Sequence, residues 1–531
     1  MSFSGLSDGD HQVELSRIQS NCSVDGENPR IVTVEASNTA STSFSVSCEA
    51  SFGSRSVVLW EYEGWSVENA SYSGNPFDVI ATVTFEHQGS SKSHTTEMFH
   101  DGDDTWKFRF TGTRMGTWNF TTSSDDPELD GHSGSVEVAP NSDSDTYGFV
   151  TNVGDKWARQ MGNSGAVEPF VPHFRETFEY EPSLSEYTDT FINNHLDVRM
   201  GEEGFNGVRI SVYARWVDSE LSSYAWPDTP KENPDPASFE ALERLIEEIH
   251  SRGGVLHIWY VGDCFRDQCI QAGFGDNGAS TDGERRILRY IAARLGPVPG
   301  WIMGYGYDND EHVSTAALQD WGSYLRNHMG WNHYLGARDQ TGGGTAYTFW
   351  PEANFYSHGQ YSNGVDNSTV RDLFENTTDK THSFDERWYK SRLGSEKAIL
   401  RQLWTMNMAG GASAIWGWQG NANDHPYPHP EWFKTFFTFW ENRFLSDMTP
   451  DNNLTDGYAL TDASGKHFVV YKEDTSSIQI DLSGMNGSQP AVAVDTQRPY
   501  QEIDLGTLDP ATQTISLPHS SDWAIAVGQF D

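Results

Sequence analysis

The sequence predicts a multidomain protein in which a (β/α)8 TIM barrel stands between an all-β domain and a smaller β domain. Strand-like and helix-like segments alternate between residues 147 and 447, whereas hydrophobic alternation of period two prevails on both sides. The chain has 531 residues, more than one hydrophobic core normally organises. We therefore expect an N-terminal β-sandwich over residues 1–140, the barrel over 147–447 and a C-terminal β domain over 450–531.

Both flanking regions show the alternation expected of half-buried strands. In the first region, short strand-like runs are divided by Gly, Ser, Asn and Asp clusters, which favours a sandwich. Its aromatic segments 106–111 and 116–121 are typical of a hairpin with the aromatic rings on one face. The polar residues 139–145 predict the boundary with the barrel. After residue 450 we expect a small β domain that packs on the barrel or binds substrate remotely.

The middle of the chain contains eight strand-like segments, the number that a TIM barrel requires. They lie at residues 169–174, 207–213, 255–261, 300–308, 333–338, 355–361, 383–386 and 413–418. Helical spacing of apolar residues predicts helices at 236–250, 283–295, 313–329, 395–409 and 430–445. A doubly wound sheet is the alternative, which is weakened because no Gly-rich phosphate loop follows the first strand.

The charge of the chain excludes several classes of partner. A formal net charge of −41 repels nucleic acid and anionic membrane surfaces, and no apolar run is long enough to span a membrane. Of the 35 basic residues, 10 are Lys and 25 are Arg. Such an acidic, Lys-poor composition resembles that of halophilic proteins, with an ordinary acidic secreted protein as the alternative. The oligomeric state is left open.

The four cysteines do not indicate a disulfide scaffold. A disulfide between Cys22 and Cys48 is left open. The spacing of Cys264 and Cys269 fits neither a zinc knuckle nor a redox motif. Residues 1–5 lack the charged and apolar regions of a signal peptide. Localisation therefore stays open between an intracellular protein and a secreted one whose signal lies outside this sequence.

Two carboxylate-rich stretches at predicted strand ends carry the chemistry. The segment 300–312 passes from an apolar strand into Asp308, Asp310 and Glu311, and the segment 382–389 contains Asp385 and Glu386. Catalytic groups of a TIM barrel lie at the C-terminal ends of its strands. Two carboxylates facing each other across an aromatic cleft suit glycoside hydrolysis, in which one donates a proton and the other either attacks the anomeric carbon or activates water. The alternative to a catalytic role is that these carboxylates are ordinary solvated loop residues, which a chain this acidic has in number.

Aromatic, Arg and His side chains near the same strand ends are candidates for substrate binding. They are His173, Arg175, Trp216, Trp259, Arg338, His358, Tyr361, Trp416 and Trp418. The tryptophans are candidates for stacking on sugar rings, although most of the 19 are expected to fill the core. Arginines match sulfate or uronate groups, or else balance the many acids. We find no metal-ligand spacing and expect no metal and no cofactor.

Several segments together resemble clan A glycoside hydrolases of the apiosidase-like type. They are 290–308, 382–389 and 401–417 in the barrel, together with 60–61, 75–77 and 102–118 in the preceding sandwich. The resemblance implies a retaining hydrolase that acts on a carbohydrate, with its acid/base after the fourth strand and its nucleophile after the seventh. By this resemblance Glu386 is the nucleophile and Asp308 the acid/base, with Glu311 second and Asp310 third. The chain lacks the Asn-Glu pair usual in clan A.

The substrate suggested by these residues is a polysaccharide of plant or algal origin, with anionic groups as an open alternative. Two other functions compete with hydrolysis. A non-catalytic carbohydrate-binding protein would use the barrel without turnover. A polysaccharide lyase would need a base such as Tyr361 beside an Arg-neutralised carboxylate at Arg338. The sugar, the linkage and the endo or exo mode are not fixed by the sequence.

Overall fold

The structure, a computed structural model, describes most of the chain. The described residues are 3–16, 18, 22–36, 38–48, 52–143, 145–176, 182–222, 225–261, 279–306, 309, 313–339, 350–359, 361, 363–377, 380–388, 393–417 and 427–530. For residues 22, 23, 47, 48, 339 and 386–388 the backbone alone is described. The chain divides into two compact units, Met1–Pro140 and Asn141–Asp531.

The first unit consists of β-sheets whose strands are antiparallel except for the parallel pair of β5 and β12. One has the order β6 (Tyr62–Glu68), β10 (Thr105–Thr111), β9 (Phe99–His100), and another has the order β5 (Ser54–Val58), β12 (Ser133–Ala139), β11 (Gly116–Ser124), β7 (Ala81–His87), β8 (Ser93–Glu97). Two short pairs precede them, β1 (Gly9–Val13) with β3 (Arg30–Val34) and β2 (Cys22–Val24) with β4 (Val46–Cys48). The second pair sets Cys22 opposite Cys48, and a bond between them stays a prediction.

Aromatic rings from the two larger sheets form the core of this unit. The ring of Trp65 on β6 lies 5.0 Å from that of Phe120 on β11, and Phe110 on β10 lies 5.1 Å from Trp118 on β11. The predicted hairpin of 106–111 with 116–121 is therefore wrong. β10 pairs with β6 and β9, whereas β11 pairs with β7 and β12. The chain crosses from one sheet to the other, and the aromatic faces meet across the core.

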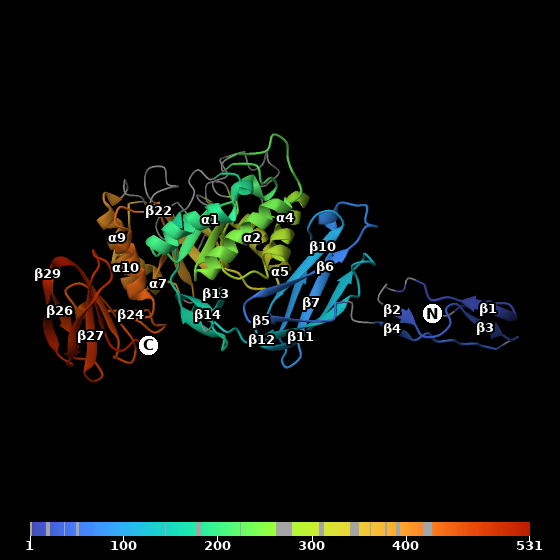
Figure 1. Ribbon diagram of the computed structural model, residues 1–531, viewed down its shortest axis with the longest axis horizontal. Helices are drawn as coiled ribbons and strands as arrows, with labels where there is room; N and C mark the ends of the chain where they lie inside the picture. The colour runs from blue at the N-terminus through green and yellow to red at the C-terminus, as the bar shows by residue number, and fades with distance from the viewer. Residues whose placement is uncertain are drawn as a thin grey trace. The chain divides into compact units, whose positions relative to one another are not determined.

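The second unit is built around a closed parallel barrel, which confirms the predicted fold class (Figure 1). Its strands, in order, are β16 (His173–Glu176), β17 (Gly207–Ser211), β18 (Val255–Trp259), β19 (Trp301–Gly304), β20 (Leu335–Asp339), β21 (Phe355–His358), β22 (Thr381–Trp388) and β23 (Ser413–Trp416). β16 pairs with β23 and closes the ring. The first strand begins later than predicted, because Pro169 and Pro172 cannot donate to a ladder.

Helices follow the strands and pack around them (Figure 1). They are α1 (Asp189–Leu196), α2 (Pro236–Ser251), α4 (Asp282–Arg294), α5 (Thr315–His328), α7 (Asn367–Glu375), α9 (Glu396–Met408) and α10 (Pro430–Trp440). α2 begins at the N-cap Asp235, whose carboxylate accepts from the Ala237 amide at 3.1 Å, and it buries Phe239, Leu242 and Ile246. In the described part of the chain, we find no helix with the length and apolar character of a membrane span.

A three-stranded antiparallel sheet, which the sequence analysis did not anticipate, packs against the barrel. Its order is β13 (Tyr147–Val153), β14 (Lys156–Met161), β15 (Ala166–Pro169). Trp157 on β14 is fully buried and donates from Nε1 to the carbonyl of His382, near the start of β22, at 2.9 Å. Trp157 belongs to one apolar cluster with Phe174, Ile302 and Phe355 of the barrel. The amino-terminal part of the barrel is therefore an apolar core.

The C-terminal residues form a six-stranded sheet. Its order is β24 (Thr449–Pro450), β25 (Tyr458–Thr461), β26 (Phe468–Asp481), β29 (Thr512–Val527), β27 (Gln489–Asp495), β28 (Glu502–Leu508). The sheet packs on the barrel helices, because Trp404 of α9 stacks on Tyr471 of β26 with ring centroids 5.1 Å apart. The division of the chain near residue 450 into a separate domain stays a prediction.

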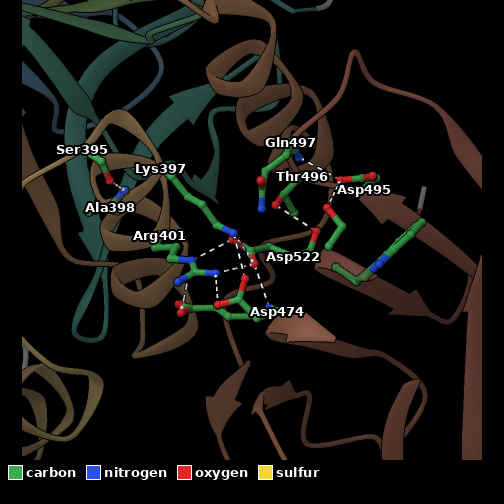
Figure 2. A network of polar contacts seen from close by, with 12 residues as sticks. Ser395, Lys397, Ala398, Arg401, Asp474, Asp495, Thr496, Gln497 and Asp522 are labelled. Carbon is green, nitrogen blue, oxygen red and sulfur yellow. Dashed lines mark hydrogen bonds and ion pairs between the residues drawn. The ribbon is translucent and has the colours of Figure 1, made fainter. Parts of the chain in front are cut away.

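An ionic network joins α9 to this sheet (Figure 2). The Arg401 guanidinium donates to both carboxylate oxygens of Asp522, at 2.8 and 2.7 Å, and also contacts Asp474 at 2.7 Å. Asp522 is fully buried, and the Asp474 amide also donates to it at 2.8 Å. The hydrogen bond to Asp522, more than any other contact, raises the pKa of Arg401. A buried carboxylate of this kind depends on its cation.

We predict that Arg401→Met lowers the free energy of unfolding by about 3–5 kcal/mol, since the buried Asp522 carboxylate loses both hydrogen bonds from the guanidinium. Urea denaturation measures the change. Arg371→Met is the matched control, because Arg371 meets Glu375 at 4.0 Å outside the network, with side chains that are 30% and 69% exposed. That control is expected to cost less than about 1 kcal/mol. Equal losses in both variants would contradict the account.

Candidate active site

The carboxyl ends of the eight parallel strands meet at one rim of the barrel. This follows from closure, because every strand runs in the same direction and β16 pairs with β23. The carboxylate stretches singled out from the sequence follow two of these strands. The segment with Asp308 comes after β19, the fourth strand, and Glu386 belongs to β22, the seventh. Charged side chains fill the interior of the barrel just below this rim.

Strands one, two and three are tied together by a buried charge pair. Arg209 of β17 donates to the Glu176 carboxylate of β16 at 2.8 Å and to the Ser211 hydroxyl at 2.7 Å. Its guanidinium carbon lies 3.5 Å from the ring centroid of Trp259 on β18. Glu176 and Arg209 are 0% and 3% exposed. Charges this deeply buried survive because each one has the other as partner.

A second set of contacts ties strands three, four, five and seven. His257 Nε2 of β18 lies 3.9 Å from Asp385 Oδ2 of β22. Arg338 of β20 donates to the Asp385 carbonyl at 3.3 Å, and its own amide donates to Asn309 Oδ1 at 3.0 Å. β18 and β22 are not neighbours in the barrel. Their side chains therefore meet through its interior, and the rim is braced from several sides.

The backbone of β22 is irregular where the carboxylates lie. Phe384 pairs with Ala414, but the next pairing joins Trp388 to Trp416, so Asp385, Glu386 and Arg387 fall in a register shift. Such bulges re-aim side chains and are common beside active sites. The Ser383 hydroxyl donates to Asp385 Oδ1, which fixes the residue before Glu386. A second irregularity follows β17, where Tyr213 has a φ of 54°.

The described residues do not include every candidate from the sequence. Asp308, Asp310, Glu311 and Trp418 lie outside them, and for Glu386 the backbone alone is described. Asn309, between two of the carboxylates, is fully buried. The catalytic roles of these residues stay predictions. Among the described residues, we find no group of three His, Cys, Asp or Glu side chains arranged to hold a metal ion.

Three of the predicted binding residues are buried in the wall near the first and eighth strands. His173 is the first residue of β16, so it lies at the amino-terminal end of the barrel and not at the rim. Trp416 is fully buried and donates to His173 Nδ1 at 3.2 Å. Arg175 binds the Glu203 carboxylate at 2.8 Å, and its guanidinium carbon lies 4.5 Å from the Tyr427 ring. These contacts are structural; sugar binding by the three residues stays a prediction.

The other predicted binding residues differ in whether they contact the interior groups below the rim or support the barrel wall. Trp259 and Arg338 belong to the interior contacts just described. Trp216 is fully buried and donates to the Tyr260 carbonyl at 2.7 Å. His358 hydrogen-bonds His382 at 2.9 Å, and Tyr361 packs edge-on against Phe384 with ring centroids 5.4 Å apart. Trp216 and His358 therefore support the barrel wall in this structure.

Sequence reasoning did not single out Arg209 or Glu176. Each is a charged residue inside or next to a short run of apolar ones: Arg209 stands between Val208 and Ile210, and Glu176 ends the strand with Phe174. Charge within a strand that is otherwise buried was the available signal. Glu176 was missed because the predicted first strand ended at residue 174, and Arg209 was missed because it stands inside the predicted second strand and not at its end.

Burial keeps many barrel histidines neutral. It lowers the pKa of His173, His250, His257, His333 and His358 to about 4, and it also lowers the pKa of His382 well below its usual value. For His257, the nearby Asp385 raises the pKa and Arg209 lowers it, but burial dominates. Neither ring nitrogen of His257 has a hydrogen-bond partner among the described residues. His257 therefore faces Asp385 as a neutral ring.

Comparison with known proteins supports the fold. Residues 56–125 match a domain family described as "Domain of unknown function (DUF5060)". No curated protein matches the chain. A Bacteroides vulgatus protein described provisionally as a glycoside hydrolase has a TM-score of 0.66 at 17% identity, covering 90% of this chain and 99% of its own.

Two further structures share the architecture. A glycoside hydrolase family 5 protein from Bacteroides vulgatus has a TM-score of 0.54 at 15% identity, over 72% of this chain and 93% of its own. A protein described as a glycoside hydrolase has a TM-score of 0.54 at 13% identity, over 72% of this chain and 97% of its own. At these identities the likeness is one of fold.

We predict that the protein loses stability as the pH falls from about 6.5 towards 4. In that window unfolded histidines bind protons that the buried ones cannot, so unfolding takes up protons and is favoured by acid. The loss is about 1.4 kcal/mol per unit of pKa difference for each histidine. Thermal unfolding at several pH values in about 1 M salt measures it, since salt screens the general repulsion of the acidic chain. A midpoint that is constant or rises between pH 7 and 5 would contradict this prediction.

Proposed function

We propose that this chain is a glycoside hydrolase that cleaves O-glycosidic bonds of a polysaccharide with two carboxylates. The observation that most supports the proposal is the register shift of β22, which holds Asp385, Glu386 and Arg387 at the end of the seventh strand. The barrel fold, with charged side chains below its carboxyl-terminal rim, agrees with it. The solved structures that share the fold and are described as glycoside hydrolases add support.

In the proposed mechanism Glu386 attacks the anomeric carbon. The bond to the leaving oxygen breaks while Asp308 gives that oxygen its proton, and a glycosyl ester forms on Glu386. Asp308 then takes a proton from water, which attacks the anomeric carbon and releases Glu386. The net stereochemistry is retention, which requires carboxyl groups about 5 Å apart, whereas inversion requires about 6.5–9.5 Å. Glu311 and then Asp310 are the alternatives for the acid.

The buried residues beside the rim suit this chemistry. Arg338 holds the carbonyl of Asp385 and thereby the backbone that leads into Glu386. The buried guanidinium group of Arg338 places positive charge in a region of low dielectric. Positive charge of this kind favours an ionised carboxylate, as a nucleophile requires, while a neighbouring carboxylate raises the pKa of the acid.

The finer identity of the substrate is part of the proposal. The resemblance of the barrel segments to apiosidase-like enzymes favours a plant-type polysaccharide. Of the arginines considered for anionic groups, Arg175 binds the Glu203 carboxylate and Arg338 donates to the Asp385 carbonyl. These partners favour a neutral sugar at the reacting position. A test panel therefore needs both neutral and anionic polymers.

We predict that Glu386→Gln lowers turnover by roughly 10³-fold or more, because the amide cannot form the glycosyl ester. Release of reducing ends from plant and algal polysaccharides, at low and high salt, measures turnover. Glu240→Gln, at an exposed position on α2, is the matched control and is expected to keep full activity. Undiminished turnover in Glu386→Gln would refute its role as nucleophile.

The same assay separates the competing functions. A binding protein would retain affinity for the polymer and release no reducing ends from any polymer, with or without Glu386. A lyase would produce an unsaturated uronate that absorbs in the near ultraviolet, with Tyr361 as a candidate base beside Arg338. Either result would replace the proposed hydrolase.

We predict that Asp308→Asn behaves as the acid variant among Asp308→Asn, Asp310→Asn and Glu311→Gln. Loss of the acid matters for a poor leaving group but little for an aryl leaving group that departs without protonation. Turnover on the polymer is expected to fall by about 10²–10⁴-fold, while the first step on the corresponding nitrophenyl glycoside stays near that of the wild type. Pre-steady-state release of nitrophenol measures that step. The same pattern in Glu311→Gln or Asp310→Asn would reassign the acid.

A further inference from the structure

A pocket of about 330 Å³ lies at the opposite end of the barrel from the candidate active site. Its lining includes His173 at the start of β16, Asn206 just before β17 and Gly253 just before β18. These positions mark the amino-terminal ends of three strands, whereas the candidate catalytic residues follow the carboxyl ends. All residues lining the pocket belong to the described part of the second unit.

A chain of hydrogen bonds presents an amide donor to this pocket. The Trp416 indole donates to His173 Nδ1 at 3.2 Å, so that nitrogen carries no proton. The neutral imidazole must then hold its proton on Nε2, which donates to Asn407 Oδ1 at 3.1 Å. The amide nitrogen of Asn407 is therefore turned away from His173. Asn407 is 2% exposed and lines the pocket, and its amide nitrogen has no partner among the described residues.

Two cations at the same pocket form no direct ion pair in the described part of the chain. Arg159 donates to the Gly253 carbonyl at 3.1 Å, and its guanidinium carbon lies 4.4 Å from the ring centroids of both Tyr147 and Phe170. Burial lowers the pKa of Arg159, although the nearby carboxylates of Glu168, Asp145 and Glu441 act in the opposite direction. Lys434, on α10, is exposed and donates to the Gly201 carbonyl at 3.0 Å.

The charge of the lining is opposite to that of the chain. Arg159, Arg252 and Lys434 line the pocket against one carboxylate, Glu441. Arg252 is engaged by Asp197 at 2.7 Å. The chain as a whole carries a net charge of −41, so an anion is attracted here by local charge alone.

Aromatic rings form the apolar wall. Phe170, Phe436 and Phe437 line the pocket, and Phe170 and Phe437 are partly exposed. The volume lies at the lower end of the range for small-molecule sites, which suits one or two rings. Flat apolar walls beside a few polar donors are typical of sites that stack a ring and fix its substituents.

We propose that this pocket binds a sugar acid, with the carboxylate on Arg159 and Lys434, the Asn407 amide donating to the ligand and the ring against Phe437. The guanidinium fork matches a carboxylate, and the ligand supplies the direct ion pair that neither cation forms within the described part of the chain. The site is separate from the candidate active site and does not depend on the proposed hydrolysis.

Titration with sodium D-glucuronate, followed by NMR of the ligand up to about 50 mM, tests the site against D-glucose, which has the same ring without the charge. Wild-type protein is expected to bind glucuronate with a Kd of about 1 mM or lower and to bind glucose far more weakly. Lys434→Gln and Arg159→Met are expected to weaken glucuronate binding by about tenfold or more. Lys466→Gln removes an exposed charge from the C-terminal sheet and is expected to leave binding unchanged.

The outcomes separate this site from others. Failure of the wild type to bind glucuronate, equal binding of glucose, or full affinity in Lys434→Gln would overturn the proposal. Binding that is lost in Glu386→Gln and kept in Lys434→Gln would assign glucuronate to the candidate active site instead. A trimer of galacturonate distinguishes the source of the ligand. Equal affinity for monomer and trimer indicates a free sugar acid, and tighter binding of the trimer indicates the end of a polymer.

Discussion

Closure of the parallel sheet is the constraint on which the rest of the second unit depends. Hydrogen bonds between β16 and β23 join the first strand to the last, so the barrel has no edge strand. Because all eight strands run the same way, every loop after a strand emerges at one rim. Residues from distant parts of the sequence, such as His257 and Asp385, thereby meet across the interior. The other features of the candidate site are consequences of this arrangement.

The two halves of the barrel interior differ in the kind of side chain that they bury. Towards the amino-terminal end, Trp157 and Phe174 belong to an apolar cluster, and hydrophobic burial stabilises the fold. Towards the rim, Arg209 and Glu176 are buried as a pair, at a desolvation cost that well-packed apolar residues would avoid. A stable barrel does not require such charges. Their concentration at one end agrees with a functional site there.

Sequence patterns predicted more of the fold than of the candidate active site. The spacing of Phe239, Leu242 and Ile246 predicted α2, because one helical face must be buried. The pairing of β10 and β11 was wrong, since alternation along a strand does not reveal which sheet receives it. The β13–β15 sheet was missed for a related reason. Its strands interrupt the pattern between sandwich and barrel without a helical signal.

For the site, the sequence named the rim but not its supports. It singled out Arg338, Trp259 and the carboxylates that follow two strands, because loops after barrel strands carry function. It missed Arg209, whose role depends on contacts with Glu176 and Trp259 on neighbouring strands. It placed His173 at the rim because the first strand was expected four residues too early. Because barrel strands are short, an error of a few residues in a predicted strand boundary moves a residue from one end of the barrel to the other.

The most direct test of the central claim is chemical trapping of the nucleophile. A 2-deoxy-2-fluoro glycoside of the sugar that the enzyme releases would form a slowly hydrolysed ester, and peptide mass spectrometry would locate it. The account predicts one label per chain, on Glu386 in the register shift of β22. A label on another carboxylate would move the nucleophile. Inversion at the anomeric carbon, with no label, would contradict the retaining mechanism.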